Sequence, residues 1–236
     1  MMEQSKGKIF LSGERGHNET SHLRSYNTFN FGNFFNPYKS ALGDLYVLND
    51  DTLAGGHSIK MHIDQDAYLI LIPVVGVIDY KDSYGNTSFV SAGEIQLTPV
   101  NKGCIVDITN PYEETLVNYL HLRIKSSNNG LLRLPLKVDF DITQYRNELL
   151  SITPTPGNGK NKIPFNISIV KLEGRREVIY KMRNSLHVFY AYVIEGAFEV
   201  QGRLLHSRDG LALWDVQDIE AEALSNDAIL LVIELY

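Results

Sequence analysis

Apolar residues recur along the chain in short runs that alternate with polar positions, and turn residues interrupt these runs roughly every 8 to 15 positions. The clearest turns are segments 82–86, 92–94, 128–130 and 209–210, where Asp, Asn, Ser, Ala, Glu and Gly gather. Helical periodicity is nearly absent, and only Ile142–Leu149 could hold one or two turns. Because a period of two places alternate side chains on one face of a strand, the sequence predicts an all-β protein.

The alternation is regular enough to give expected bounds for each strand. The predicted strands are 45–49, 67–72, 77–81, 87–90, 95–98, 104–108, 116–125, 148–153, 167–172, 177–182, 188–194, 197–200, 211–214, 219–223 and 229–235.

An internal repeat indicates two similar domains. An apolar run, a glycine and an alternating strand occur around Gly76 and again around Gly196, which lies 120 residues later. A hairpin and a second glycine, Gly93 or Gly210, follow each copy. We therefore expect one β-domain at residues 1–125 and a second at 144–236. The connector at 126–143 contains Leu131, Leu132, Leu134 and Leu136 and is expected to pack. Closing each sheet into a barrel or jelly roll removes exposed strand edges.

Composition and charge exclude several classes of protein. Lys and Arg number 22 against 28 Asp and Glu, so the net charge of −6 argues against direct nucleic-acid binding and a basic membrane patch. Cys104 is the one cysteine, which excludes a disulfide framework and a Cys-rich zinc site. The longest apolar run, Ala67–Ile78, is shorter than the roughly 18 to 20 residues of a membrane span. With no apolar stretch after Met1–Ile9, we expect a soluble, cytoplasmic protein.

Several segments carry a family resemblance. Ser25–Phe31, Phe34–Pro37 and Leu45–Asp50 resemble the amino-terminal signature of the pirin family, as do Gly76 to Asn86 and Ser91–Gln96. The resemblance is specific between about Gly13 and Lys125 and looser beyond. Pirins are two-domain cupins, so the resemblance implies a bicupin of two tandem cupin barrels (double-stranded β-helices, or jelly rolls), like the bacterial pirin-like members. This agrees with the repeat.

The same resemblance implies a metal site in the first barrel, held by a His-x-His pair and a His-x-Glu pair. A one-residue gap sends both ligands of a pair to the same face of their strand. In this chain the first pair corresponds to His62 and Asp64, and the second to Val106 and Ile108. Neither Val106 nor Ile108 has a donor atom, so the sequence predicts a degenerate metal site with no cofactor. Fe or another divalent metal is expected only if other residues rescue the site.

Two residues are candidates for such a rescue. Cys104 shares its strand parity with Val106 and Ile108, and His121 shares a face with Tyr119. A rearranged site of His62, Asp64, Cys104 and His121 is therefore one alternative. The other is a barrel refilled with apolar side chains. The isolated His187 and His206 of the second domain are expected to be structural.

The remaining polar groups define a candidate pocket. It is centred on His62 and Asp64, and the further candidates are Tyr68, which stands where pirins often carry Glu, together with Cys104, Val106, Ile108 and His121. We expect this pocket to hold water or a small neutral or cationic organic molecule in place of a metal. The alternative is that the side chains of His62 and Asp64 reach solvent at the barrel mouth and bind nothing.

Two classes of function follow. The first is a metal-free pirin-like bicupin that binds, senses or joins a partner, either a small molecule or a protein, without an intact dioxygenase site. The second is an enzyme: a metal-dependent, quercetinase-like dioxygenase (quercetin 2,3-dioxygenase), or a metal-free acid/base catalyst using His62, Asp64 and Tyr68. The loss of both donors at Val106 and Ile108 favours the first class. The sequence assigns no catalytic residue and leaves the oligomeric state open.

Overall fold

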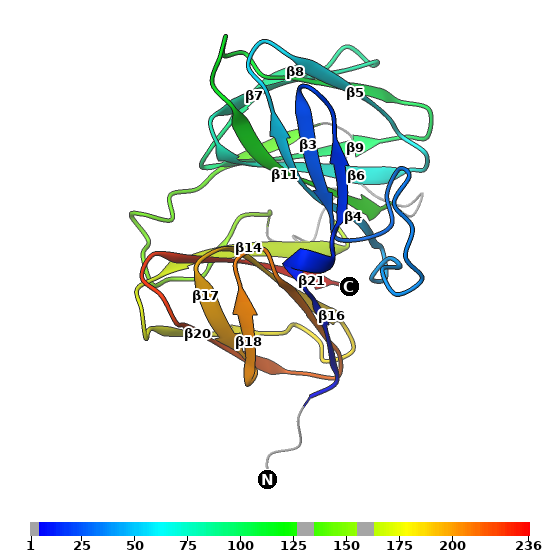
Figure 1. The fold of residues 1–236 in the computed structure, drawn as a ribbon. Coiled ribbons are helices and arrows are strands. Elements are labelled where there is room, and N and C mark those ends of the chain that lie inside the picture. Colours follow the sequence, from blue (N-terminus) through cyan, green and yellow to red (C-terminus); the bar gives the residue numbers. More distant parts are fainter. Residues whose placement is uncertain (1–4, 127–134, 155–162) are drawn as a thin grey trace. The chain divides into compact units, whose positions relative to one another are not determined.

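Each predicted strand has a counterpart in the computed structural model, which describes residues 5–126, 135–154 and 163–236 (Figure 1). The all-β prediction is confirmed, and the described helix is the short 3-10 turn Ser12–Glu14. No helix in those residues is long and apolar enough to cross a membrane. The chain divides into two compact units, called here the first barrel and the second barrel.

The first barrel contains the described residues between Arg15 and Phe140, together with Ile163, and consists of two antiparallel sheets. Across the larger sheet the order is β12 (Leu136–Asp139), β9 (Glu94–Val100), β6 (Ala67–Val75), β11 (Val117–Lys125), β4 (Leu45–Leu53), β3 (Leu23–Asn27) and β2 (Gly16–Glu19). Across the smaller sheet it is β5 (Ser58–His62), β10 (Ile105–Thr109), β7 (Val77–Asp82) and β8 (Thr87–Ser91). Their inner faces enclose one apolar core, which includes Leu69, Leu71 and Tyr119.

The second barrel repeats this arrangement. Its larger sheet has the order β1 (Gly7–Phe10), β19 (Gly210–Leu213), β16 (Val188–Glu195), β21 (Ala228–Leu235), β14 (Phe165–Leu172) and β13 (Leu150–Ser151). Its smaller sheet has the order β15 (Glu177–Lys181), β20 (Asp218–Ala223), β17 (Ala197–Val200) and β18 (Arg203–His206). The core of this barrel includes Val170, Phe189 and Val232.

The two repeat glycines occupy matching turns, which supports the two-domain interpretation. Gly76 joins β6 to β7 with a φ of 83°, and Gly196 joins β16 to β17 with a φ of 80°. A Cβ on Gly76 would lie 2.8 Å from Val117 Cγ1, and one on Gly196 would lie 2.8 Å from Ala228 Cβ. Both the backbone conformation and the close approach therefore require glycine.

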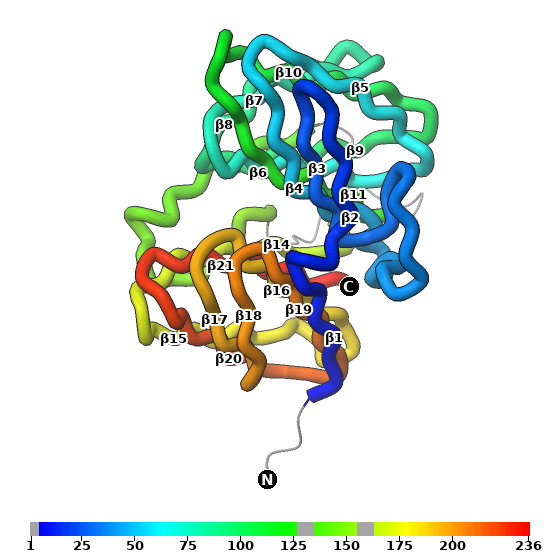
Figure 2. Tube along the Cα trace, viewed as in Figure 1, coloured from blue at the N-terminus to red at the C-terminus, as the bar shows by residue number. Residues whose placement is uncertain are grey.

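The expected domain limits differ from the observed units at the amino-terminal end and in the connector. Strand β1 pairs with β19, so residues 7–10 belong to the second barrel and not to a domain at 1–125 (Figure 2). In the expected connector at 126–143, residues 127–134, with Leu131, Leu132 and Leu134, lie outside the described residues, while β12 pairs with β9 of the first barrel. Strand β3, at the start of the aromatic segment, extends the larger sheet beside β4.

Candidate functional site

The register of β5 differs by one residue from the expected one. Ile59 and Met61 face the core, whereas Ser58, Lys60 and His62 are exposed. Met61 lies directly opposite the buried Val106, and His62 lies opposite the exposed Ile105. The prediction that His62 points into the barrel is therefore wrong. The apolar alternation of Ile59, Met61 and Ile63 takes the inner positions, because a one-residue shift would turn all three outward.

Asp64 and Tyr68 also differ from expectation. The Asp64 side chain is 69% exposed, at the edge of a cavity and not at its centre. Tyr68 is buried on the face of β6 opposite to the core residues Leu69 and Leu71, and it does not line that cavity. The predicted pocket centre and the predicted Tyr68 wall are therefore wrong.

Cys104, Val106 and Ile108 do point into the first barrel, as predicted, but they belong to its apolar core. The Cys104 thiol is buried and lies 3.6 Å from the Ser83 hydroxyl, which donates to it. None of the three residues lines the cavity, so they are not walls of a polar pocket.

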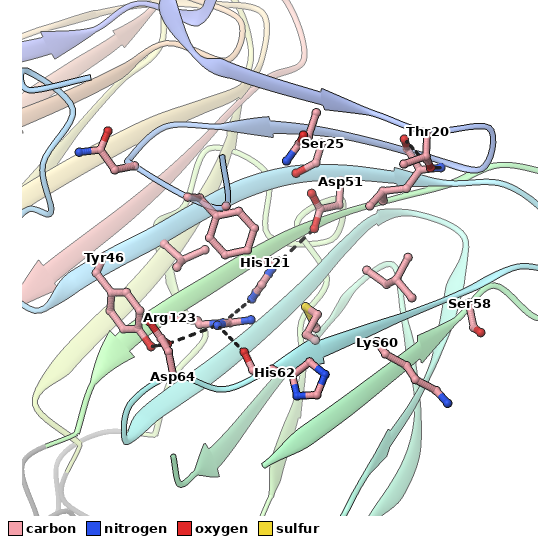
Figure 3. A pocket seen from close by; sticks show the side chains of 18 of the residues that line it. Thr20, Ser25, Tyr46, Asp51, Ser58, Lys60, His62, Asp64, His121 and Arg123 are labelled. Atoms are coloured by element: carbon pink, nitrogen blue, oxygen red, sulfur yellow. Dashed lines mark hydrogen bonds and ion pairs between the residues drawn. The ribbon is translucent and has the colours of Figure 1, made fainter. Parts of the chain in front are cut away.

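A cavity of about 690 Å³ opens between β3, β4, β11 and β5 of the first barrel (Figure 3). Apolar side chains form part of its wall: Leu23, Phe31, Val47, Ile59 and Met61. Polar side chains form the rest, and they include Ser25, Tyr46, Asp51, His121 and Arg123, with Lys60, His62 and Asp64 at the exposed side. Three of the residues predicted for the site, His62, Asp64 and His121, line this cavity, and His121 is the buried one.

Four side chains form a continuous line across this cavity, called here the polar row: Asp51, His121, Arg123 and Asp64 (Figure 3). Arg123 Nε donates to His121 Nε2 at 3.0 Å, and His121 Nδ1 lies 3.6 Å from Asp51 Oδ2. At the other end, Arg123 Nη1 lies 3.7 Å from Asp64 Oδ1. It also donates to the backbone carbonyl of His62 at 3.5 Å.

Strand geometry explains this line. His121 and Arg123 follow Val117 and Tyr119 at every second position of β11, so all four face the inside of the barrel. Asp51 lies directly opposite Tyr119 on the neighbouring strand β4. A register shift next to Arg123 leaves Tyr46 without a direct cross-strand partner, and its hydroxyl donates to Asp64 Oδ1 at 3.5 Å.

Burial and the neighbouring guanidinium fix the charge and the tautomer of His121. The residue is 0% exposed, and burial, followed by the Arg123 charge, lowers its pKa against the opposing effect of Asp51. Because Arg123 Nε can only donate, His121 Nε2 accepts and the ring proton resides on Nδ1, facing Asp51. His121 is therefore neutral, and its only lone pair is taken.

Arg123 is 3% exposed, and burial lowers its pKa, while Tyr46 and the carboxylates of Asp64 and Asp51 oppose this effect. An arginine stays protonated under such conditions, so the cavity contains a fixed positive charge. The Phe31 ring lies 5.7 Å from this guanidinium and packs edge-on to His121.

Several buried polar atoms near the row have no hydrogen-bond partner among the described residues. They are Asp51 Oδ1, His121 Nδ1, both side-chain atoms of Asn49 and the Tyr119 hydroxyl. Leaving one such group unsatisfied costs about 1–3 kcal/mol. Water or a bound molecule would remove this cost, so the inner face of β4 and β11 has the chemistry of a binding site.

The residues at the four metal positions do not fit a metal ion. They offer one exposed imidazole, one exposed carboxylate and two aliphatic side chains. Throughout the described ranges no group of three or more His, Cys, Asp or Glu could hold a metal ion. The alternative site of His62, Asp64, Cys104 and His121 is not assembled, because His62 is exposed, Cys104 lies in the core and Arg123 occupies the free nitrogen of His121.

The second barrel contains a different buried carboxylate, Glu234. It accepts hydrogen bonds from the Tyr180 hydroxyl at 2.8 Å and the Arg183 backbone N–H at 2.9 Å, and it lies 2.7 Å from His187 Nδ1. Burial raises the pKa of Tyr180, and Glu234 adds to the effect. His187 is therefore not isolated; it has a structural partner.

Comparisons with known proteins match both halves of the chain. The sequence model described as Pirin matches residues 11–122, and the quercetinase C-terminal cupin domain matches residues 154–235. The chain is 28% identical over 226 residues to the quercetin 2,3-dioxygenase of Escherichia coli K12, covering 93% of this chain and 95% of the relative. A putative quercetin 2,3-dioxygenase of Pasteurella multocida is 26% identical over 229 residues, covering 95% of this chain and 97% of the relative.

Solved structures show the same fold. The crystal structure of YhhW from Escherichia coli superposes with a TM-score of 0.84 at 24% identity, covering 98% of each chain. The bacterial pirin YhhW in complex with nickel(II) gives a TM-score of 0.83 at 23% identity, covering 98% of this chain and 99% of the other.

Proposed function

Since the chain belongs to the pirin family, we propose that it is a metal-free bicupin that binds a small organic molecule in the cavity of the first barrel. The observation that carries this proposal is the polar row, in which His121 links a buried guanidinium to a buried carboxylate; one oxygen of this carboxylate has no hydrogen-bond partner among the described residues. The four metal positions supply no matching donor set, which supports a binding role without a metal.

The geometry favours binding over acid/base catalysis. His121 has the right residue type for a general base, but its accepting nitrogen is engaged by Arg123. The other acid/base candidates, His62, Asp64 and Tyr68, do not meet at one place, because Tyr68 lies on the far face of β6. The residues of the row would hold and orient a ligand without moving a proton.

A quercetinase-like dioxygenase is the second candidate, and the names of the relatives favour it. This activity would need a metal, and the positions of His62, Asp64, Val106 and Ile108 lack the donors to retain one. We therefore expect no turnover of quercetin by the protein, with or without added Fe, Ni or Cu.

A thermal-shift screen of small organic molecules tests the proposal. Hits on the native protein should be lost in Arg123→Gln and weakened in Tyr46→Phe, which keeps the ring and removes one hydroxyl. Asp107→Asn, on the outer face of β10, is the matched control and should keep every hit. If all hits survive both cavity variants, the cavity is not the binding site and a protein partner on the outer surface becomes the better explanation.

A further inference from the structure

Asp51 is a buried carboxylate that has no Lys or Arg partner in the described ranges. It is 3% exposed, it lines the cavity, and its Oδ1 has no hydrogen-bond partner among the residues that the structure describes. The nearest basic atom recorded for its other oxygen is His121 Nδ1 at 3.6 Å. Because that imidazole is neutral, it provides a dipole and no compensating charge.

Arg123 does not fill this gap. The His121 ring lies between Arg123 and Asp51, and the ion pair of Arg123 is with Asp64 (Figure 3). The polar row therefore contains two carboxylates and one cation, which leaves one negative charge at the Asp51 end. Lys60 is the other cation at the cavity, but it is exposed on the opposite face of β5 from the core. A buried charge is normally paired or hydrogen-bonded, so a ligand that completes this site must bring donors and positive charge.

We propose that the ligand is an organic ammonium, a primary amine with an apolar body, whose N–H groups bind Asp51 Oδ1. This inference rests on the proposed function and names the chemical class of the ligand. The apolar body has matching walls in Leu23, Phe31 and Val47. Asp51 would repel an anionic ligand, and Arg123 already has an anionic partner in Asp64. A neutral hydroxyl could donate one bond to Asp51 but would leave the charge uncompensated.

Three probes of one shape test the charge preference on the native protein. Benzylamine, benzyl alcohol and benzoate share a ring and differ in the charge of the attached group. Isothermal titration at neutral pH should rank benzylamine first, about tenfold or more above benzyl alcohol, since charged hydrogen bonds are the stronger ones. Benzoate should not bind. This ranking needs no variant, so it does not depend on how a substitution folds.

Asp51→Asn then identifies the residue responsible. This near-isosteric change should remove the preference for benzylamine over benzyl alcohol. Asp44→Asn is the matched control, because Asp44 is an exposed acidic residue of the same barrel that does not line the cavity. It should change benzylamine affinity by less than about threefold.

The outcomes separate the two proposals. Benzoate binding best, a benzylamine preference that survives Asp51→Asn, or no benzylamine binding at all would each overturn the inference. If benzyl alcohol or benzoate binds and Arg123→Gln abolishes that binding, the proposed function stands with a different ligand class. If the screen yields no hit that depends on the cavity, the proposed function itself fails.

Discussion

The middle strands of the two larger sheets occupy the same place and carry opposite chemistry. Strand β11 lies between β6 and β4, and β21 lies between β16 and β14. Towards the end of its inner face, β11 carries His121 and Arg123, whereas β21 carries Glu234. Both barrels thus bury charge on a strand that is otherwise apolar.

The two buried carboxylates show what the difference means. Glu234 has three polar neighbours within 2.9 Å, and they engage both of its oxygens. Within the described part of the chain, Asp51 has one basic neighbour, at 3.6 Å, and an oxygen without a donor. A satisfied carboxylate stabilises the fold, whereas an unsatisfied one beside a cavity is available to a ligand. We therefore interpret the second barrel as a scaffold and the first as the binding domain.

The largest expected effect is on the stability of the second barrel. Glu234→Ala leaves the Tyr180 hydroxyl, the Arg183 N–H and His187 without their acceptor, and it should lower the free energy of unfolding by about 3–5 kcal/mol. Urea denaturation measures this. Asp51→Asn should change the free energy of unfolding by less than about 1 kcal/mol, because Asp51 Oδ1 accepts no hydrogen bond from the described residues that the substitution could remove. Equal losses in the two variants would contradict the contrast between the barrels.

The second largest expected effect is a loss of stability that depends on the register of β5. Met61 is buried in the core, so Met61→Ala should cost about 2–4 kcal/mol of unfolding free energy. The neighbouring His62→Ala should stay within about 0.5 kcal/mol and leave ligand binding unchanged, because His62 is exposed. The reverse order of the two losses would place His62 inside the barrel after all.

A smaller effect should appear in the pH dependence of stability. The pKa of His121 is lowered in the folded state, so between that value and the unfolded pKa of 6.5 the unfolded chain binds more protons. The stabilising contribution is therefore complete above pH 6.5 and is lost as the pH falls through the folded pKa. Its charged neighbours are Asp51 and Arg123.

Urea titrations of the native protein and of His121→Gln, which can still accept from Arg123, measure this contribution. The native protein should lose more stability on acidification than the variant. His206→Gln, at an exposed position, is the control and should behave like the native protein. Identical pH profiles for native protein and His121→Gln would contradict a buried neutral imidazole.

Alternation of apolar residues was sufficient to predict most of the core strands, because burial on one face imposes that pattern. It missed six short strands, β1, β2, β3, β5, β12 and β18, which have four or five residues each and carry polar residues such as Lys8 and His17. Motif alignment placed His62 inward, but the local triplet Ile59, Met61 and Ile63 decides the register. Parity with Tyr119 made His121 a candidate but left open whether its side chain faces the barrel interior.

Arg123 and Asp51 were missed as site residues. Arg123 continues the parity of Tyr119 and His121 along an apolar strand, and a charged residue at an inward position was the available signal. Asp51 was missed because the expected strand ended at Asn49, whereas β4 continues to Leu53. The contact between these two strands depends on long-range pairing, which the sequence pattern does not specify.

Nickel retention tests the central claim most directly. After equilibration with nickel(II) and desalting, the native protein should carry less than about one nickel atom per ten chains, since its positions lack a three- or four-donor set. Cavity ligands found in the screen should bind equally well before and after treatment with a chelator. One nickel per chain, lost in His62→Ala, would contradict a metal-free binding site and restore the dioxygenase alternative.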